Sequence, residues 1–461
     1  MKKLLLFVSF ACLVISSNTF AQTVPTTQWS DNANTLWYND ATTFTLSTAA
    51  DLAGLSELVA AGDKFVGKTI LLGADIDLGA HLFSPIGKSV ALTFSGTFDG
   101  NNHTISNGFI VTPSGAFTGF FGQVTDGIIK DLKFNNLYVR GKDSSAGIAG
   151  GILRSTITDC HVTGLDLAAP AGANIGGIVG SLITNSHVLR CSVSGTVTGE
   201  AQVGGLIGGA WDLATITESY STAATSAQYL AGGLVGYTAP TFFPNRPITV
   251  NNCFSTGNVG VSLGRAGGFY GGSSGELIIK NSYSTGTVTG PELLGALIGT
   301  VANLTTVNNF WDVEASAITN LVGQWDGPEV PVNMISKTTT EMKSDAMVAL
   351  LNSGQENGPW MRNDAVNNGY PSFADAALSA PSFSNTLVVV IYPTVVESVI
   401  NVETAANLSG YAIFSISGKQ IAADRLNSTS AQISADGLAA GVYILQITTD
   451  QGKVTRKFVK N

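Results

Sequence analysis

The chain has 461 residues, of which 53 are glycine, and only 12% are charged, about half of the ~25% that is usual in globular proteins. The formal net charge is −9, which excludes a surface built for a phosphate backbone, so no nucleic-acid partner is expected. A hydrophobic content of 44% excludes a disordered chain. Frequent glycine together with Thr, Ser, Val and Ile indicates strands joined by many turns.

Residues 1–21 have the pattern of a secretory signal peptide. Lys2 and Lys3 give it a positive start and an apolar run follows, which together with small residues before the cut is the usual arrangement. Cleavage is predicted between Ala21 and Gln22. The apolar run is shorter than the ~20 residues needed to cross a bilayer, and we expect no transmembrane segment elsewhere.

The mature chain would keep three cysteines, Cys160, Cys191 and Cys253. An odd number at wide spacing does not predict a disulfide framework, and no Cys or His spacing matches a zinc site. We therefore expect no metal centre built from these residues and no cofactor.

Residues 22–118 are predicted to form an N-terminal cap and the first strands. The stretch from Thr48 to Val59 has helical spacing after a Thr/Asp start. A helix at this place would cover the open end of a repetitive β structure, whose strand edges and apolar core need protection.

A short motif of glycine, two apolar residues and glycine dominates residues 119–325. Its closing glycines are spaced 28, 30, 28, 28, 35 and 28 residues apart, and the long interval carries a proline-rich insertion. The copies are Gly119–Gly122, Gly147–Gly150, Gly177–Gly180, Gly205–Gly208, Gly233–Gly236, Gly268–Gly271 and Ala296–Gly299.

This period predicts a mainly β fold: a parallel β-helix or β-solenoid of about seven turns of 28–30 residues. Equivalent residues would stack about 4.8 Å apart, with Val, Ile and Leu in the core and glycine allowing turns with positive φ. A series of β-hairpins is the alternative that the period leaves open.

A mostly polar column follows the closing glycine of the motif by nine or ten residues, except where the proline-rich insertion lengthens the gap. It holds Asp131, Asp159, Arg190, Glu218, Asn252, Asn281 and Asn309. Stacked in order, these residues predict a surface ladder of ion pairs worth about 0–1 kcal/mol each, with asparagine amides bonded along the axis. The alternative is a carboxylate site, with Asp131 and Asp159 as Ca²⁺ candidates.

Two further columns stand beside the polar one. The first holds Leu132, Cys160, Cys191, Ser219, Cys253, Ser282 and Phe310, and it predicts mostly buried small side chains rather than nucleophiles. The second holds Tyr220, Phe254, Tyr283 and Trp311. These aromatics are the candidate ligand-binding residues, because a row of rings can stack on sugars, although the favoured interpretation is that they cover a corner of the core.

The tetrapeptides resemble those of secreted proteins with GLUG motifs, and the resemblance runs from about Thr45 to Phe373. It also rests on Ala74–Leu78, Phe98–Ile105 and the closing stretch around Trp360 and Asn367–Pro371. The resemblance implies a β-solenoid with a surface or adhesive role. Residues 326–373 would then be the C-terminal flank of the solenoid, with a short helix.

Residues 374–385 have the Pro/Ser/Ala composition of a linker, and residues 386–461 alternate like a small antiparallel β-sandwich. This last segment resembles the C-terminal sorting domain of the type IX secretion system. The resemblance rests on Tyr392-Pro393, Ser417–Lys419, Leu438–Tyr443 and the basic end. It implies the type IX machinery as partner, export from a Bacteroidetes-type cell, and release or attachment at the cell surface.

The sequence thus favours a secreted or cell-surface adhesin that presents a rigid β-solenoid face to a glycan or to a host or surface protein. No catalytic residue is assigned. The alternative is a polysaccharide lyase or hydrolase on the same β-helix, which needs clustered acid/base groups that the topology would have to gather from distant turns.

Overall fold

The structure is a computed structural model that describes residues 23–239, 246–327, 333–355, 358–373, 389–392, 395–415, 419–449 and 452–460. The predicted signal peptide, its cleavage site at Ala21 and Gln22, and the linker 374–385 lie outside these ranges, as do Pro393 and Ser417-Gly418. The chain divides into two compact units, Met1–Pro381 and Ser382–Asn461.

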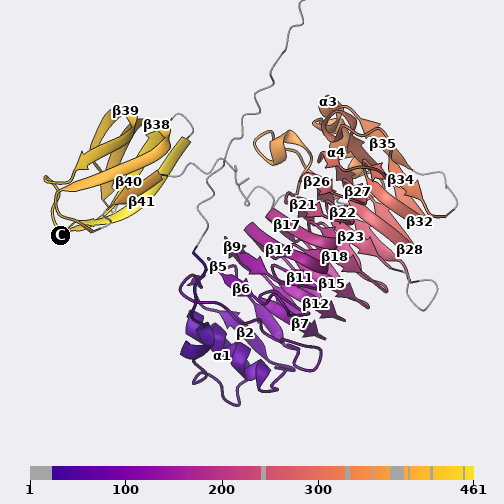
Figure 1. The fold of residues 1–461 in the computed structure, drawn as a ribbon, viewed down its shortest axis with the longest axis horizontal. Helices are drawn as coiled ribbons and strands as arrows, with labels where there is room; N and C mark the ends of the chain where they lie inside the picture. The colour runs from indigo at the N-terminus through magenta and orange to yellow at the C-terminus, as the bar shows by residue number, and fades with distance from the viewer. Residues whose placement is uncertain are drawn as a thin grey trace, which may run out of the picture. The chain divides into compact units, whose positions relative to one another are not determined.

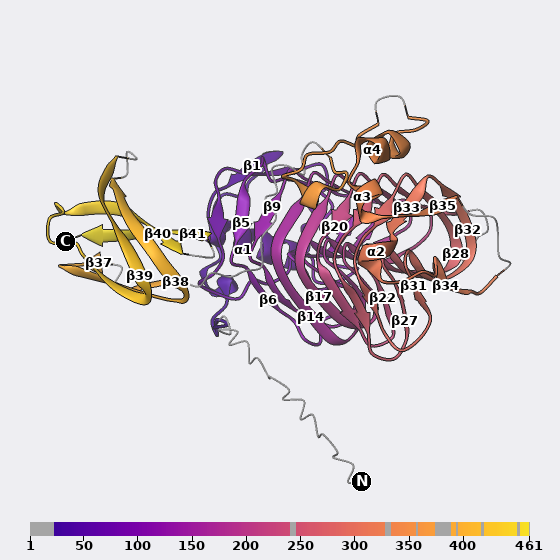
Figure 2. The same ribbon diagram turned by 90° about the horizontal axis from the view of Figure 1, so that it is seen from above.

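The first unit is a β-solenoid, as the repeat predicts (Figures 1 and 2). One file of ten parallel strands follows the whole coil, with one strand from each turn. In chain order these are β1 (Thr43–Leu46), β2 (Thr69–Leu72), β4 (Thr97–Asp99), β8 (Ile128–Lys130), β13 (Thr156–Thr158), β16 (His187–Leu189), β19 (Thr215–Thr217), β24 (Ile248–Asn251), β28 (Tyr270–Lys280) and β32 (Ile298–Val307).

A second file of parallel strands contains the glycine motifs. It merges with the ten-strand file at β28 and β32, which run through both. Its other members are β7 (Phe121–Thr125), β12 (Ala149–Leu153), β15 (Val179–Ile183), β18 (Ile207–Ala210), β23 (Val235–Thr238) and β34 (Val322–Trp325).

The two files together make one 16-stranded sheet, and the remaining strands of the coil form a separate 19-stranded sheet. Its longer members are β14 (His161–Gly176) and β17 (Ser192–Gly204). The others are β3 (Ile76–Asp77), β5 (Thr104–Ser106), β6 (Phe109–Val111), β9 (Lys133–Asn135), β10 (Tyr138–Arg140), β11 (Ser145–Ala146), β20 (Tyr220–Ser221), β21 (Ala224–Ala227), β22 (Leu230–Gly232), β25 (Phe254–Ser255), β26 (Val259–Val261), β27 (Arg265–Gly267), β29 (Tyr283–Ser284), β30 (Val288–Thr289), β31 (Leu294–Gly295), β33 (Asn309–Asp312) and β35 (Met334–Lys337).

The coil has ten turns rather than seven, because the segment expected to hold a cap and first strands already supplies three of them. β1, β2 and β4 pair in register with each other and with β8. These early turns lack the tetrapeptide and are filled by large side chains instead; the ring of Phe83, for example, stacks on that of Phe120 in the first tetrapeptide, with centroids 4.8 Å apart. Beyond Gly299, Asn320–Gly323 continues the motif with asparagine in place of its first glycine.

The closing glycines line up along the axis. Strand pairing sets Gly150, Gly180, Gly208 and Gly236 beside one another in consecutive turns. A Cβ added at Gly180 would lie 2.6 Å from the Gly150 carbonyl oxygen, and one at Gly208 would lie 2.6 Å from that of Gly180. Close approach of neighbouring backbones, and not positive φ as expected from the sequence, is the reason for glycine in this file.

The predicted N-terminal helix is present as α1 (Ala49–Ala60). Thr48 caps it, with the side chain of Asp51 returning to the cap backbone. Leu52, Leu55 and Val59 are fully buried in the core of the coil. The helix therefore covers apolar side chains at the first turns, where a parallel coil would otherwise expose them.

Two short 3-10 helices and three short α-helices complete the first unit: η1 (Trp29–Asn32), α2 (Val313–Ser316), α3 (Thr339–Met342), α4 (Asp345–Leu351) and η2 (Asn367–Gly369). Residues 333–373, hereafter the flank, contain α3, α4 and η2. The flank and the coil share a small second core, in which aromatic side chains of the coil pack against Met342, Met347, Leu351, Trp360 and Tyr370.

The second unit is a six-stranded sheet. It contains β36 (Val389–Tyr392), β37 (Val395–Val396), β38 (Val399–Ser415), β39 (Gln420–Ser434), β40 (Gly441–Thr449) and β41 (Gly452–Lys460). All pairings are antiparallel except β37 with β41. The strands belong to one sheet around a core of Ile400, Val402, Ile413, Leu445 and Ile447, rather than to two separate layers.

Candidate functional site

The polar column predicted from the sequence occupies one corner of the coil. Its members have left-handed backbone conformations, with φ between 48° and 55°. They are Asp131, Asp159, Arg190, Glu218, Asn252, Asn281 and Asn308. Asn308, not Asn309, is the last member, because the final turn is one residue shorter than the repeat. Asn, Asp and a few other polar residues tolerate this conformation better than β-branched ones, which explains their place in the sequence.

Asp159 and Arg190 form an ion pair between successive turns, with Arg190 Nη2 2.7 Å from Asp159 Oδ2. Burial raises the pKa of Asp159, but hydrogen bonds from Arg190 and Thr158 lower it by more. The pKa of this carboxyl group therefore lies below the usual value for aspartate. Asp131 pairs instead with the ammonium group of Lys130, 3.0 Å away. Both Ca²⁺ candidates therefore already face a cationic side chain.

The asparagines continue the column only in part. Asn308 donates to Asn281 across 3.2 Å, and Asn281 donates to the side chain of Asn251. Asn252 instead exchanges two hydrogen bonds with Gln355 of the flank and accepts one from Trp360 Nε1. The end of the column thus holds the flank in place.

The cysteine column is buried. Cys160, Cys191 and Cys253 are free thiols with no solvent exposure. Burial raises the pKa of the Cys253 thiol to about 12 and also raises that of Cys160. Thiols held protonated in the core are poor nucleophiles. Asn309 takes the last place in this column, where Phe310 was expected, and donates to the backbone of Ile279.

The aromatic column is a stacked ladder. The rings of Tyr220 and Phe254 are 4.5 Å apart and within 5° of parallel, and those of Phe254 and Tyr283 are 5.3 Å apart and within 2°. Strand pairing sets Phe310, not Trp311, next to Tyr283. Trp311 points into the core of the coil instead, so its assignment to this row is wrong by one residue.

The flank covers this ladder, so its rings are not an open row on the surface. Trp360 and Phe373 lie against Phe254, with ring centroids 6.0 and 5.6 Å away. Tyr283 has no exposed surface, and its hydroxyl donates to the carbonyl of Pro371 and accepts from Asn367. Burial raises the pKa of Tyr283 well above its usual value.

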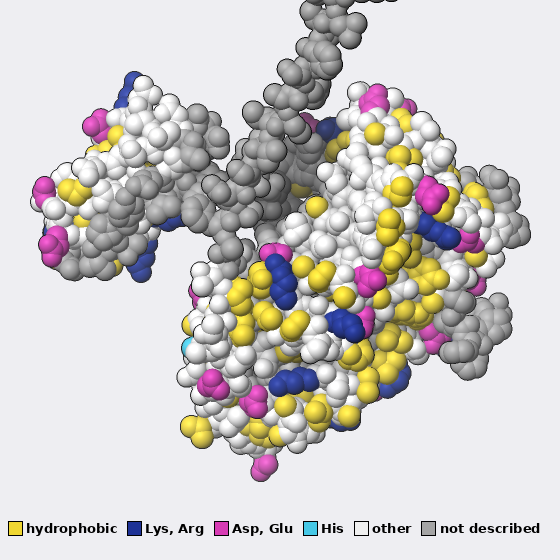
Figure 3. Space-filling view, in the orientation of Figure 1, with side chains coloured by type: hydrophobic (Ala, Val, Ile, Leu, Met, Phe, Trp, Pro, Cys, Tyr) yellow, Lys and Arg dark blue, Asp and Glu magenta, His cyan; other side chains and the backbone are white. Residues whose placement is uncertain are grey.

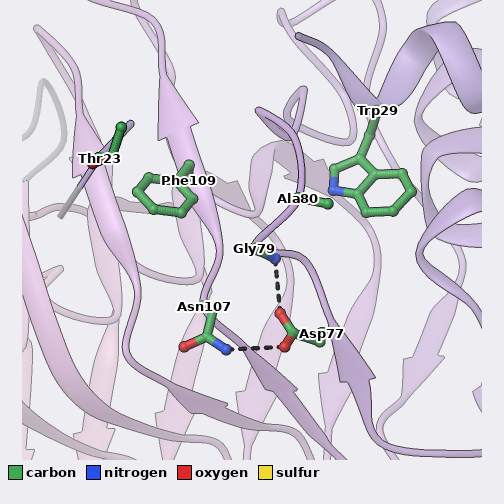
Figure 4. Close-up of a pocket in the computed structure, with 7 residues that line it drawn as sticks. All are labelled: Thr23, Trp29, Asp77, Gly79, Ala80, Asn107 and Phe109. Carbon is green, nitrogen blue, oxygen red and sulfur yellow. Dashed lines mark hydrogen bonds between the residues drawn. The ribbon is translucent and has the colours of Figure 1, made fainter. Parts of the chain in front are cut away.

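A pocket of about 570 Å³ opens on the coil near its first turns (Figure 4). It is lined by Thr23, Trp29, Asp77, Gly79, Ala80, Asn107 and Phe109. The lining comes from the first described residues, from the bend after β3, and from the start of β6, so three stretches separated in sequence supply it. Its volume is within the ~300–1,000 Å³ of ordinary small-ligand sites.

The polar floor of the pocket is Asp77 with Asn107. Asp77 Oδ1 accepts a hydrogen bond from the Gly79 backbone at 2.8 Å, and Oδ2 accepts one from Asn107 Nδ2 at 3.1 Å. Asn107 Oδ1 in turn accepts from Asn136 in the next turn. In Figure 4 the rings of Trp29 and Phe109 stand on opposite sides of the bend at Gly79 and Ala80, and the Asp77 carboxylate and the Asn107 amide lie below the rings.

Both rings are held by further contacts. The Trp29 indole N–H donates to the carbonyl of Leu78 at 3.0 Å, and the indole meets the His81 ring edge-on at 4.6 Å. Phe109 packs on Tyr138 with centroids 5.6 Å apart, and the guanidinium of Arg140 lies 3.7 Å above Tyr138. These walls are fixed before any ligand arrives, which removes part of the entropic cost of binding.

Sequence reasoning missed this pocket. Trp29 lies before the repeats, and Asp77 and Asn107 fall in early turns that carry no tetrapeptide. The only available signal was that aromatic and acidic residues stand near the resemblance segment Ala74–Leu78. Nothing in the spacing shows that the N-terminal residues run beside Leu82. There the backbone N–H of Trp29 donates to the Leu82 carbonyl.

Residues 390–461 match the family model described as secretion system C-terminal sorting domain. The match covers the six strands of the second unit. The protein is therefore secreted or attached to the cell surface, and the secretion machinery that reads such tails is its partner. Within the described residues, no helix is long and apolar enough to cross a membrane.

A curated relative, Halomucin from Haloquadratum walsbyi, is 32% identical over 139 residues; the match covers 27% of this chain and 1% of Halomucin. The chain thus spans a very small part of that relative. Among solved structures, a candidate immunoglobulin A1 protease from Bacteroides ovatus has 19% identity and a TM-score of 0.49, over 73% of this chain and 93% of the other.

Proposed function

We propose that the protein is an adhesin or binding protein, delivered to the cell surface or medium, that presents a rigid face of the β-solenoid to a glycan or protein ligand. Its tail supports the location. The adhesive role is what its GLUG-like repeats imply. The closely stacked glycine file supports rigidity, since neighbouring turns cannot shift without backbone collisions.

The outward face of the ten-strand file carries this proposal. One column of this face has threonine in seven of its ten turns, and none of the seven is buried. They are Thr43, Thr69, Thr97, Thr156, Thr215, Thr249 and Thr305. Ten strands at ~4.8 Å spacing give a face roughly 43 Å long, enough to contact several units of an extended ligand at once.

The chemistry of this face suits a neutral, hydroxyl-rich partner or an extended peptide. Each threonine offers a methyl group and a hydroxyl that both donates and accepts. On the same face, Lys130 pairs with Asp99 at 2.6 Å, so these two charges offset one another. Figure 3 shows a similar charge distribution over the coil, where cationic and acidic side chains lie singly or beside each other on a mostly uncharged surface.

The carboxyl groups of the coil that shift in pKa do so in the direction of an ion pair. Hydrogen bonding with Arg154 lowers the pKa of Asp126, as Arg190 does for Asp159. A glycosidase needs one carboxyl group with a raised pKa to protonate the leaving group. The contacts of these two aspartates therefore support a structural role, in keeping with a binding protein.

The test is a glycan and surface-protein array probed with the labelled full chain and two face variants. We expect the parent chain to bind one ligand class on the array. Thr156→Glu and Thr215→Glu should each weaken this binding by at least about tenfold, because a charge on the face must be desolvated when the ligand binds. Ser226→Glu, at an exposed position of β21 on the 19-stranded sheet, is the matched control and should bind normally.

Absence of any retained ligand, or equal binding by the face variants and the parent chain, would contradict the proposal. The same preparation is incubated with each retained glycan and the products are separated by chromatography. Release of shortened or unsaturated sugars would replace binding with catalysis as the function.

A further inference from the structure

We propose that the pocket around Asp77 binds one neutral pyranose ring of a glycan. This inference rests on the proposed function and deepens it by naming a site and a ligand class. It concerns a surface separate from the threonine face, since the pocket is lined from the bend after β3, the start of β6 and the N-terminal residues.

The first argument is the pairing of aromatic walls with a planar polar floor. A pyranose has two faces of C–H groups and an equatorial edge of hydroxyls, so it needs an apolar surface and hydrogen-bonding partners at right angles to it. Trp29 and Phe109 supply the apolar surface on two sides of the pocket, and Asp77 and Asn107 line it below the rings in the view of Figure 4. Aromatic rings with a few placed polar groups are the usual lining of small-molecule sites.

The second argument is unused hydrogen-bonding capacity on the floor. Each carboxylate oxygen of Asp77 accepts one hydrogen bond, from the Gly79 backbone and from Asn107, although a carboxylate oxygen has two lone pairs. Asn107 Nδ2 gives one hydrogen to Asp77 and retains a second. The exposed carboxylate can thus accept from two adjacent hydroxyls while the amide donates to one of them.

The third argument separates a sugar from a cation. A carboxylate that shares a pocket with aromatic rings also attracts ammonium groups. Here, however, the amide of Asn107 turns its N–H₂ group toward Asp77 and its oxygen toward Asn136, so the floor offers a donor beside its acceptors. A hydroxyl matches that mixture because it donates and accepts, whereas an ammonium ion only donates.

The test uses two NMR readouts on the full chain: ligand-observed spectra for binding, and protein-observed spectra of the tryptophan indole N–H groups for the site. The probes are glucose, galactose and mannose as neutral sugars, glucosamine as an amino sugar, and N-acetyl-lysine amide as a simple ammonium compound. We expect one or more neutral hexoses to bind with a Kd on the order of 1 mM, the range of single-ring ligands held by few contacts. The indole signal that is absent from Trp29→Phe should shift on saturation.

Asp77→Ala should weaken hexose binding by at least about tenfold through loss of two acceptors. Asp40→Ala, which removes an exposed carboxylate that does not line the pocket, is the matched control and should leave it unchanged. Since Asp77 also holds Gly79, the midpoint of thermal unfolding is recorded for both. Asp77→Asn, which keeps one acceptor and the size of the side chain, serves if Asp77→Ala unfolds early.

The outcomes separate the two proposals. Preferential binding of N-acetyl-lysine amide, or no shift of the Trp29 indole with any sugar, overturns the pyranose site. Array binding that survives Asp77→Ala but is lost in Thr156→Glu leaves the adhesive function standing without this pocket. Hexose binding at Asp77 with no array ligand for the long face supports the pocket and refutes the threonine face.

Discussion

Replacing Gly208 with alanine tests the backbone stacking that makes this coil possible. A Cβ at Gly208 would lie 2.3 Å from the Asn174 carbonyl carbon, 2.4 Å from the Ile175 nitrogen and 2.6 Å from the Gly180 carbonyl oxygen. All three atoms are backbone, so no side chain can rotate away. The neighbouring turns must separate, and the turn-to-turn hydrogen bonds at this corner must lengthen.

The magnitude follows from those contacts. Overpacking a core costs about 1–3 kcal/mol, and rigid backbone places this substitution at the upper end. The adjacent amide of Ile207 donates to the Leu234 carbonyl at 2.9 Å, and weakening one or two such bonds adds about 1 kcal/mol each. We expect Gly208→Ala to lower the free energy of unfolding by about 3–5 kcal/mol, or the midpoint of thermal unfolding by roughly 6–15 °C.

The assay is thermal and urea unfolding followed by circular dichroism. Gly260→Ala is the matched control, because Gly260 also lies in a strand of the coil but its added Cβ meets only the Thr289 hydroxyl, at 3.3 Å. Alanine is favoured over glycine in strands by about 0.5–1 kcal/mol, so this variant should be neutral or slightly more stable. If Gly208→Ala unfolds within 0.5 °C of the parent chain, roughly the precision of a melting curve, the stacking argument fails.

Three more substitutions test the columns and the flank. Burial raises the pKa of Cys253 to about 12, above the ~8.5 of an unfolded thiol. The contribution of this protonated thiol to the free energy of unfolding should therefore be complete below about pH 8.5 and decrease above it. Cys253→Ser should remove this pH dependence in urea titrations at several pH values. Asp159→Asn should cost at most about 1 kcal/mol at pH 7. Because the folded pKa of Asp159 is lowered, the difference should vanish as pH falls below about 4; an unchanged gap in acid would refute the ion-pair account. Trp360→Ala should destabilise the flank by about 3–5 kcal/mol and increase binding of a hydrophobic dye, whereas the same change at exposed Met361 should do neither.

The sequence by itself determined the repetitive part of the molecule. A period of 28–30 residues, set by the glycine motifs from Gly119 to Gly299, is enough to predict which residues become neighbours, because in a parallel coil each residue stacks on its equivalent one turn away. The helix after Thr48 and the sorting tail also carry local signals, a capping pair and short alternating strands, that need no tertiary information.

Only the tertiary structure decided what lies outside that period. The three early turns are filled by aromatic side chains and lack the glycine motif. The last turn is one residue shorter than the repeat, so Trp311 lies in the core and Phe310 takes its expected place in the ladder. Trp360 covers Phe254 from more than a hundred positions away, and Trp29 meets the bend near Asp77. Periodicity fixes contacts between equivalent residues, but contacts made by unrepeated segments depend on where the chain returns in space, and no spacing in the sequence records that.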